Sequence, residues 1–263
     1  TSSNIYSSIG QFEFNVEEFL PERIKLELKA KDKIYRSKQN IEVELNANYL
    51  YGAPASNNKA KATSVITTLD YPSKKYSKFY FGNHKQSKKP VRKDIFDGKL
   101  NDKGNVKLSF MTPDEVKSPL SASVIASVFE SGGRAINRSI RKQVWPSETI
   151  IGVKPRYIGG YAPLNQNINF DLVNIDKDEK IKGLKDVNVR LIYEERRYHW
   201  FYDEHNGWDS KYTQLDHEKY NSKINTKDGQ IAKISLPAVN QYGRYRLEIE
   251  SKDKKIFTSY RFR

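Results

Sequence analysis

One stretch of strict alternation, residues 41–47 (IEVELNA), constrains most what this chain can fold into. Apolar and polar side chains alternate there with a period of two, which is typical of a strand that buries one face. The segment that follows, residues 49–55 (YLYGAPA), contains Gly52 and Pro54. Glycine adopts backbone angles that other residues avoid, and proline cannot donate to a strand ladder. We therefore expect a half-buried strand that ends in a turn at this point.

Further alternating segments before residue 147 predict an antiparallel β-sandwich. The expected strands cover residues 23–30, 40–50, 61–70, 76–82, 105–111, 121–130 and 134–144. Gly132 and Gly133 separate the last two of these strands, which is a hairpin signal. Residues 83–104 are rich in charge and contain Pro90, so they predict a long connection.

The second half of the chain repeats this kind of pattern. Strands are expected at residues 151–156, 167–173 and 187–196. A final hairpin joins residues 243–249 to residues 256–262 across the turn KDKK. No helical period of useful length appears in between. We therefore predict an all-β fold, with tandem antiparallel, immunoglobulin-like β-sandwiches.

The length of 263 residues accommodates two such sandwiches of about 100 residues each. We expect residues 1–20 to form the last strand of a preceding domain or a linker, residues 21–147 the first sandwich and residues 148–263 the second. Trp145 lies between the two sandwiches and is expected to pack at their junction. The N-terminus begins in mid-pattern and lacks the features of a signal peptide, so the chain looks like a piece of a longer protein.

Composition excludes several classes of site. There is no cysteine, so disulfides, thiolate metal sites and a cysteine nucleophile are excluded. Lys and Arg number 46 against 32 Asp and Glu, and the net charge of +14 attracts polyanions non-specifically. Because these basic residues recur along the whole chain, no specific nucleic-acid partner is predicted. No segment approaches the ~20 apolar residues that span a bilayer.

Five basic residues gather in one expected loop, residues 83–93. A solvated loop is the expected interpretation, and a binding loop is the alternative, because long loops are often functional. The residues are Lys85, Lys88, Lys89, Arg92 and Lys93.

Residues 194–208 (EERRYHWFYDEHNGW) form the richest cluster of chemically active side chains. On a strand, His199, Phe201 and Asp203 share one face, while Tyr198, Trp200 and Tyr202 share the other. One histidine and one carboxylate on a face are too few ligands for a metal site. His205 precedes an Asn-Gly pair, which is a strong hairpin signal. We therefore predict a hairpin lined by aromatic residues.

The same aromatic residues leave a binding function open. Trp200, Tyr202 and Trp208, near Arg196 and Arg197, are loosely suited to stack on sugars or on single-stranded bases. Half-buried aromatic side chains are ordinary in a sandwich, and this is the expected interpretation. An exposed row of Trp and Tyr would favour a binding module, and a buried row would count against it.

Signals for catalysis are weak throughout the sequence. No serine lies in a Gly-x-Ser-x-Gly elbow, and no pair of carboxylates is singled out for glycoside hydrolysis. The Gly132-Gly133-Arg134 segment lacks the lysine and the strand–helix context of a phosphate-binding loop. We predict no catalytic, cofactor-binding or metal-binding residue and no enzymatic activity.

Three segments carry a family resemblance: residues 16–24 (VEEFLPERI), 49–55 (YLYGAPA) and 128–138 (VFESGGRAINR). Together they resemble the bacterial alpha-2-macroglobulins. In that family a phrase like the first joins one macroglobulin-like sandwich to the next, and a phrase like the second follows the second strand of the new sandwich. Residues 194–208 also resemble a recurring phrase of the family, which is structural there.

The resemblance implies macroglobulin-like domains from the interior of a broad protease-trapping inhibitor. It implies a structural scaffold without a catalytic site and without a cofactor, in a periplasmic protein with an inner-membrane anchor outside this chain. Its partners would be neighbouring domains and, through the full-length protein, target proteases. The reactive thioester of some family members needs a cysteine, so this chain cannot hold it. The alternative is an extracytoplasmic β-sandwich module that binds carbohydrate or protein partners.

Overall fold

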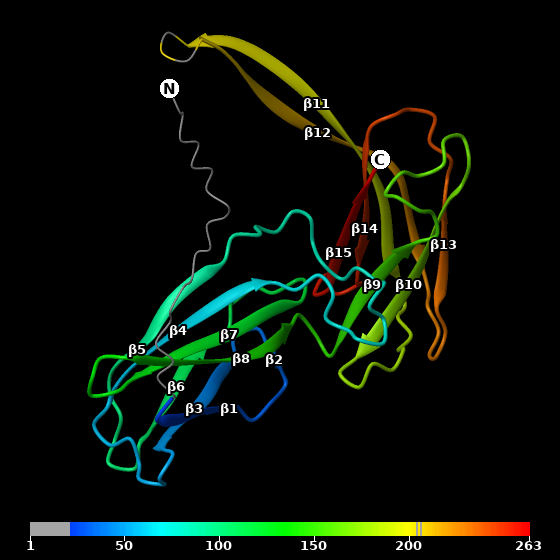
Figure 1. Ribbon diagram of the computed structural model, residues 1–263. Coiled ribbons are helices and arrows are strands. Elements are labelled where there is room, and N and C mark those ends of the chain that lie inside the picture. Colours follow the sequence, from blue (N-terminus) through cyan, green and yellow to red (C-terminus); the bar gives the residue numbers. More distant parts are fainter. Residues whose placement is uncertain (1–21, 204, 206) are drawn as a thin grey trace, which may run out of the picture.

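The computed structural model describes residues 22–203, 205 and 207–263. Within them the regular structure consists of fifteen strands, β1 to β15, which form two β-sandwiches joined end to end (Figure 1). The predicted all-β fold is therefore confirmed. The described part of the chain contains no helix long and apolar enough to cross a membrane. The strand expected within residues 1–20 lies outside the described residues.

The N-terminal sandwich packs a three-stranded sheet on a five-stranded sheet. The first sheet has the order β1 (Ile24–Lys29), β3 (Asn40–Tyr49) and β6 (Asn105–Met111). The second has the order β2 (Ile34–Arg36), β8 (Ala135–Trp145), β7 (Leu120–Phe129), β4 (Lys59–Thr68) and β5 (Val91–Lys99). All these neighbours are antiparallel except β2 and β8, which run parallel.

The alternating residues 41–47 lie in β3, as predicted. The apolar side chains of residues 41–47 are buried in the core of this sandwich, while Glu42 and Glu44 are exposed. The turn after β3 is also as expected. Gly52 has φ of 98°, and Pro54 forms an isolated bridge with Asn48 instead of extending the ladder. Backbone geometry alone therefore explains this motif.

The C-terminal sandwich packs a three-stranded sheet on a four-stranded sheet. The smaller sheet has the order β13 (Ala232–Leu236), β10 (Ile168–Asp176) and β9 (Thr149–Pro155). The larger has the order β12 (Gly207–Ile224), β11 (Val187–Asp203), β14 (Arg244–Glu250) and β15 (Phe257–Phe262). Strands β11 and β12 continue far beyond the sandwich as a projecting hairpin (Figure 1).

Three predictions differ from the observed strands, two of them for strands and one for a connection. Residues 76–82 form turns with one isolated bridge at Tyr80, because their aromatic side chains pack at the domain junction instead of in a ladder. Residues 83–104 are not one connection, since β5 lies within them. This strand is at the edge of its sheet, so its largely exposed, charged residues mask the alternation. The strand expected to end at residue 196 continues to Asp203.

Candidate functional site

An apolar cluster joins the two sandwiches. Trp145, at the end of β8, is buried there as predicted, against aromatic residues of the segment between β4 and β5. The C-terminal sandwich contributes Val173 and Ile175, which lie on the outer face of β10. Strand β10 is consequently buried on both faces. Burial of this kind stabilises the contact, since removing apolar surface from water contributes about 25 cal/mol per Å².

The segment from residue 69 to residue 90, here called the strap, reaches from the N-terminal sandwich onto the C-terminal one. Tyr80 exchanges two backbone hydrogen bonds with Val153 of β9, at 2.8 and 2.9 Å. Two residues later, the Gly82 carbonyl accepts a hydrogen bond from the Ser259 amide of β15 at 3.0 Å. Strands β9 and β15 are the edge strands of the two sheets. The strap therefore covers two edges that would otherwise expose unpaired backbone groups.

Beneath the strap lies a buried ion cluster on the outer face of the larger sheet. Its centre is Arg246, whose side chain is 1% exposed. Arg246 pairs with Glu194, with Glu248 at 2.8 Å and with Asp216 at 2.5 Å. Lys85 of the strap joins the cluster, because its Nζ lies 2.9 Å from Glu248 Oε1. The N-terminal sandwich thus contributes a charge to the C-terminal one.

Opposite charges outweigh burial in this cluster. Burial is the largest single influence on Glu248 and works to raise its pKa, but hydrogen bonds from Lys85 and Arg246 together hold that pKa below 4.5. The same balance lowers the pKa of Asp216, where Arg246 is the main opposing partner. Burial works to lower the pKa of Arg246, yet its carboxylate partners raise it. All three groups therefore stay charged at neutral pH.

For His84 of the strap, burial prevails and favours the uncharged form. Its ring stacks on Tyr80, with centroids 5.2 Å apart, and its backbone amide donates to Ser259 Oγ at 2.8 Å. Burial, reinforced by the nearby cations Arg261 and Lys88, lowers the pKa of His84 below 6.5. The folded state therefore favours the neutral imidazole of His84.

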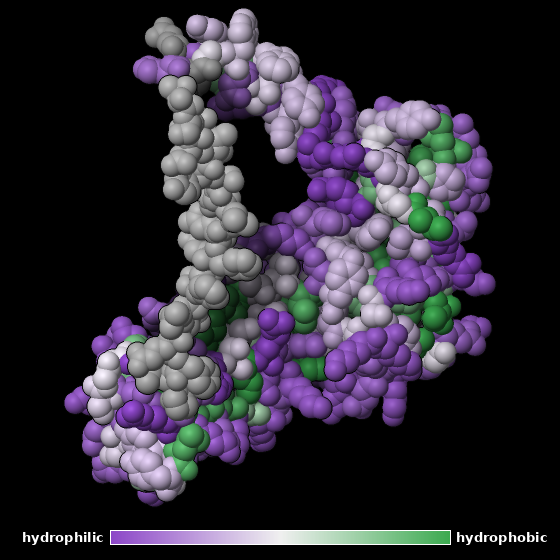
Figure 2. All heavy atoms as spheres, in the orientation of Figure 1, coloured by the Kyte–Doolittle hydropathy of each residue, from purple (hydrophilic) through white to green (hydrophobic). Residues whose placement is uncertain are grey.

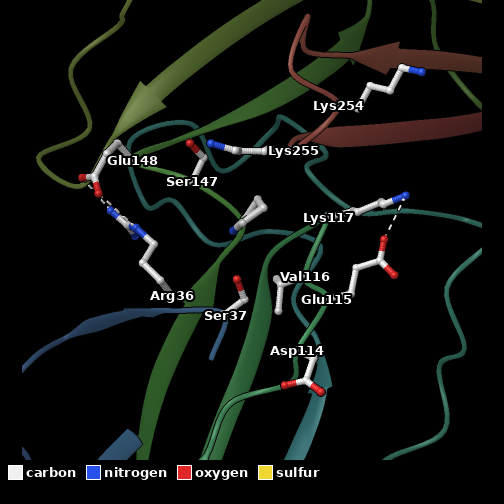
Figure 3. Close-up of a pocket in the computed structure, with 11 residues that line it drawn as sticks. Arg36, Ser37, Asp114, Glu115, Val116, Lys117, Ser147, Glu148, Lys254 and Lys255 are labelled. Carbon is white, nitrogen blue, oxygen red and sulfur yellow. Dashed lines mark hydrogen bonds and ion pairs between the residues drawn. The ribbon is translucent and has the colours of Figure 1, made fainter. Parts of the chain in front are cut away.

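A polar cleft of about 510 Å³ lies on another side of the junction. Figure 3 shows Arg36 reaching Glu148 and Lys117 reaching Glu115, while Lys254 extends from the turn before β15. The Arg36 and Glu148 side chains lie 2.7 Å apart. The lining residues include serines but no histidine, so no serine there has the base that nucleophilic catalysis requires. The cleft offers mixed, paired charges and no arrangement for chemistry.

The projecting hairpin presents a row of exposed aromatic side chains. Its members lie on one face, as the register pairs Tyr198 with Tyr212 and Tyr202 with Trp208. Figure 2 shows paler side chains on the hairpin than on the hydrophilic surface at its base. Arg196 caps the row, with its guanidinium 4.3 Å from the Tyr212 ring centroid. The exposed fractions are 57% for Tyr198, 69% for Trp200, 63% for Tyr202, 71% for Trp208 and 50% for Tyr212.

The hairpin predicted from residues 194–208 is confirmed, and so is its division into two faces. The expectation that its aromatic residues are half-buried is wrong, because the hairpin extends beyond the sandwich. His199 and Asp203 lie on the opposite face, and His217 pairs with Glu195 at 2.7 Å. In the described ranges no group of three or more His, Cys, Asp or Glu residues is placed to hold a metal ion.

Sequence reasoning missed the ion cluster and the strap. Of the five cations in residues 83–93, Lys85 joins the cluster and Lys88 pairs with Asp70 at 2.6 Å, so the loop is only partly a solvated surface. One available signal was the alternation of β14, which places Arg246 and Glu248 together on the face away from the core. Their burial was invisible, since the covering strap is distant in sequence.

Comparison with known families matches almost the whole chain to two consecutive profiles. Residues 22–146 match the "Bacterial Alpha-2-macroglobulin MG5 domain". Residues 152–263 match "Bacterial macroglobulin domain 6".

The individual relatives found are also bacterial alpha-2-macroglobulins. An alpha-2-macroglobulin of Xylella fastidiosa is 32% identical over 94% of this chain, and that of Escherichia coli is 29% identical over 95%. The chain spans only 15% and 16% of these two relatives.

Among solved structures, the native conformation of E. coli alpha-2-macroglobulin superposes with a TM-score of 0.84 at 28% identity, covering 95% of this chain and 16% of that one. The E. coli protein activated by porcine elastase gives 0.82 at 29% identity, covering 93% and 22%.

Proposed function

The chain belongs to the bacterial alpha-2-macroglobulin family, as its MG5 and MG6 domains, and we propose that this pair acts as one rigid, non-catalytic scaffold unit within a protease-trapping protein. The observation that carries the proposal is the junction. An apolar cluster, a strap that pairs with both edge strands and a shared ion cluster connect the domains. Contacts of three kinds, spread over several elements, oppose independent motion of the two sandwiches.

The relatives support a rigid pair. In E. coli alpha-2-macroglobulin, both the native and the elastase-activated structures resemble the whole two-domain chain, with TM-scores of 0.84 and 0.82. A large rearrangement between MG5 and MG6 in either state would lower one of these scores. The pair would therefore transmit movement between its neighbours without bending itself.

Membership of the family supports two further parts of the proposal, protease trapping and location. The chain would not contribute the thioester, for which it has no cysteine. Its partners would be the adjacent domains and, through the full-length protein, target proteases. We place the full-length protein in the periplasm, with an inner-membrane anchor outside this chain. Elastase and trypsin, which activate the E. coli relative, are suitable test proteases.

A loosened junction tests this proposal. A Cβ atom at Gly152 would lie 2.6 Å from the Phe81 ring, so Gly152→Ala forces this buried ring of the strap away from β9. Gly132→Ala is the matched control, because nothing lies within 4 Å of its Cβ position. We expect the full-length Gly152→Ala protein to protect a protein substrate from elastase less well than the control. Equal protection by both variants would contradict the scaffold role.

A second candidate function rests on the exposed aromatic row. A module that binds carbohydrate or protein partners needs Trp and Tyr side chains accessible to solvent, and five on the hairpin are at least half exposed. Binding of the 263-residue chain to immobilised bacterial glycans, lost in Trp200→Ala, would support this function. The absence of any such binding would remove its carbohydrate form.

A further inference from the structure

The outer face of β11 is buried beneath the strap near the sandwich and exposed along the projecting hairpin. Side chains of even-numbered residues point to this face, so Ile192 and Glu194 share it with Arg196, Tyr198 and the rest of the aromatic row. Ile192 and Glu194 are buried on the side of the sheet that the strap covers. The aromatic row is thus a direct extension of the contact surface between MG5 and MG6.

The exposed part of β11 pairs with few other strands. Past the pair Glu194–Arg244, the described register of β11 runs along β12 alone. A two-stranded ribbon is marginally stable in water unless it packs on something else. Contiguous exposed apolar surface of this kind marks interaction sites in soluble proteins.

The chemistry of the row favours a protein surface over a sugar. Tyr, Trp and Arg are the residues most enriched at the centres of protein interfaces. The rings are tilted against each other, by 49° for Tyr198 and Tyr212 and by 72° for Tyr202 and Trp208. Rings at these angles form a ridged surface, not the flat platform on which a sugar ring stacks.

The rest of the full-length polypeptide is the candidate to cover the aromatic row. Relatives of this chain are about six times longer, since it spans 15–16% of them. Its two sandwiches match domains numbered five and six in the family, so further domains of the same kind accompany them.

We propose that the aromatic row of the β11–β12 hairpin is a docking surface for another macroglobulin-type sandwich of the same full-length polypeptide. The row continues the MG5–MG6 interface, and a third domain seated on it would extend that interface along the hairpin. The inference rests on the proposed place of this pair within a longer chain, but not on protease trapping.

Photo-crosslinking in the full-length protein tests the proposal. p-Benzoylphenylalanine replaces Trp200 on the row or, as matched control, His199 on the opposite face of the same strand. Both positions are exposed, so neither change is expected to prevent folding. After irradiation, position 200 should crosslink to a peptide outside residues 1–263, within a species of monomer mass. Position 199 should give several-fold fewer of these crosslinks.

Three results would overturn the proposal. A crosslinked dimer would assign the row to a second copy of the chain. The absence of crosslinks at position 200 would show a bare surface, and equal yields at both positions would show no preference for the aromatic face. In a second measurement, Trp200→Ala/Trp208→Ala should accelerate hydrogen exchange of the crosslinked partner peptide several-fold, and unchanged exchange would contradict docking.

The same preparation separates this proposal from the proposed function. A full-length protein that crosslinks as expected but fails to trap elastase would refute protease trapping alone. One that traps elastase without crosslinks at position 200 would refute the docking surface alone.

Discussion

The two halves of β11 share one strand and one face, yet they have opposite surroundings. The half that ends at Glu194 is flanked by β14 and β12 and lies beneath the strap, so charged side chains are buried there in ion pairs. The half from Arg196 to Tyr202 is flanked by β12 alone and exposes aromatic rings. On this face, charged residues are thus buried in the junction half and aromatic residues are exposed in the hairpin half.

This reversal shows that burial along this strand depends on whether another segment packs over it, and not on the hydropathy of its residues. Alternation sets which residues share a face, but a segment more than 100 residues away in sequence covers one half of it. The junction half therefore contributes to stability within the chain. The hairpin half contributes little to stability, which is consistent with a surface reserved for another domain.

Removal of the central cation should have the largest effect. Arg246→Met removes the buried cation that Glu194 and Glu248 share, although Arg261 still pairs with Glu194 and Lys85 with Glu248. Removing one partner from a buried ion pair costs about 3–5 kcal/mol of unfolding free energy. The matched change Arg196→Met in the hairpin half removes a cation–π contact at an accessible site, worth about 0.5–1 kcal/mol. Urea unfolding of both variants measures the difference. Similar losses would mean that the two halves are energetically alike.

Lifting the strap should have an intermediate effect. Gly152→Ala brings a Cβ atom 2.6 Å from the Phe81 ring, and overpacking of this kind costs roughly 1–3 kcal/mol. The loss should appear in thermal unfolding as a lower Tm, and Gly132→Ala should leave the Tm unchanged. If Gly152→Ala proves neutral, the strap yields easily and does not hold the domains together.

Acidification should weaken the junction through His84. Because burial and nearby cations lower its pKa below 6.5, the unfolded chain binds a proton more readily than the folded one, and stability falls as the pH drops below 6.5. Glu248 has a pKa held below 4.5, so its stabilising contribution is lost only in stronger acid. His84→Phe keeps an aromatic ring against Tyr80 and should reduce the loss of Tm between pH 7.5 and pH 5. An unchanged pH dependence in this variant would exclude His84 as its source.

Truncation in the hairpin half should have the smallest effect. Trp200 is 69% exposed, so Trp200→Ala should change the unfolding free energy of the 263-residue chain by no more than about 0.5 kcal/mol. Urea unfolding provides this value too. A loss comparable with that of Arg246→Met would show that the row stabilises this pair of domains directly.

Much of this fold was predictable, because its strands bury one face and alternate. The run at residues 41–47, the turn at Gly52 and the hairpin of residues 194–208 all follow from local patterns. Strand β5 was not predictable in the same way, since an edge strand with both faces largely exposed carries no alternation.

The candidate site was less accessible to sequence reasoning. The pairing of Lys85 with Glu248 joins residues from two domains, and no local pattern encodes it. The exposure of Trp200 depends on how far β11 projects beyond β14, which is a property of the sheet and not of the segment itself.

The rigidity of the two-domain unit is most directly tested with Trp145. The Trp200→Phe/Trp208→Phe protein retains Trp145 as the single tryptophan of the 263-residue chain, buried in the cluster between the sandwiches. Its fluorescence during urea unfolding reports the junction, while far-ultraviolet circular dichroism reports the strands of both domains. Coincident midpoints, the test of a single cooperative unit, are the predicted result. Exposure of Trp145 at a clearly lower urea concentration than the loss of strand signal would contradict the account.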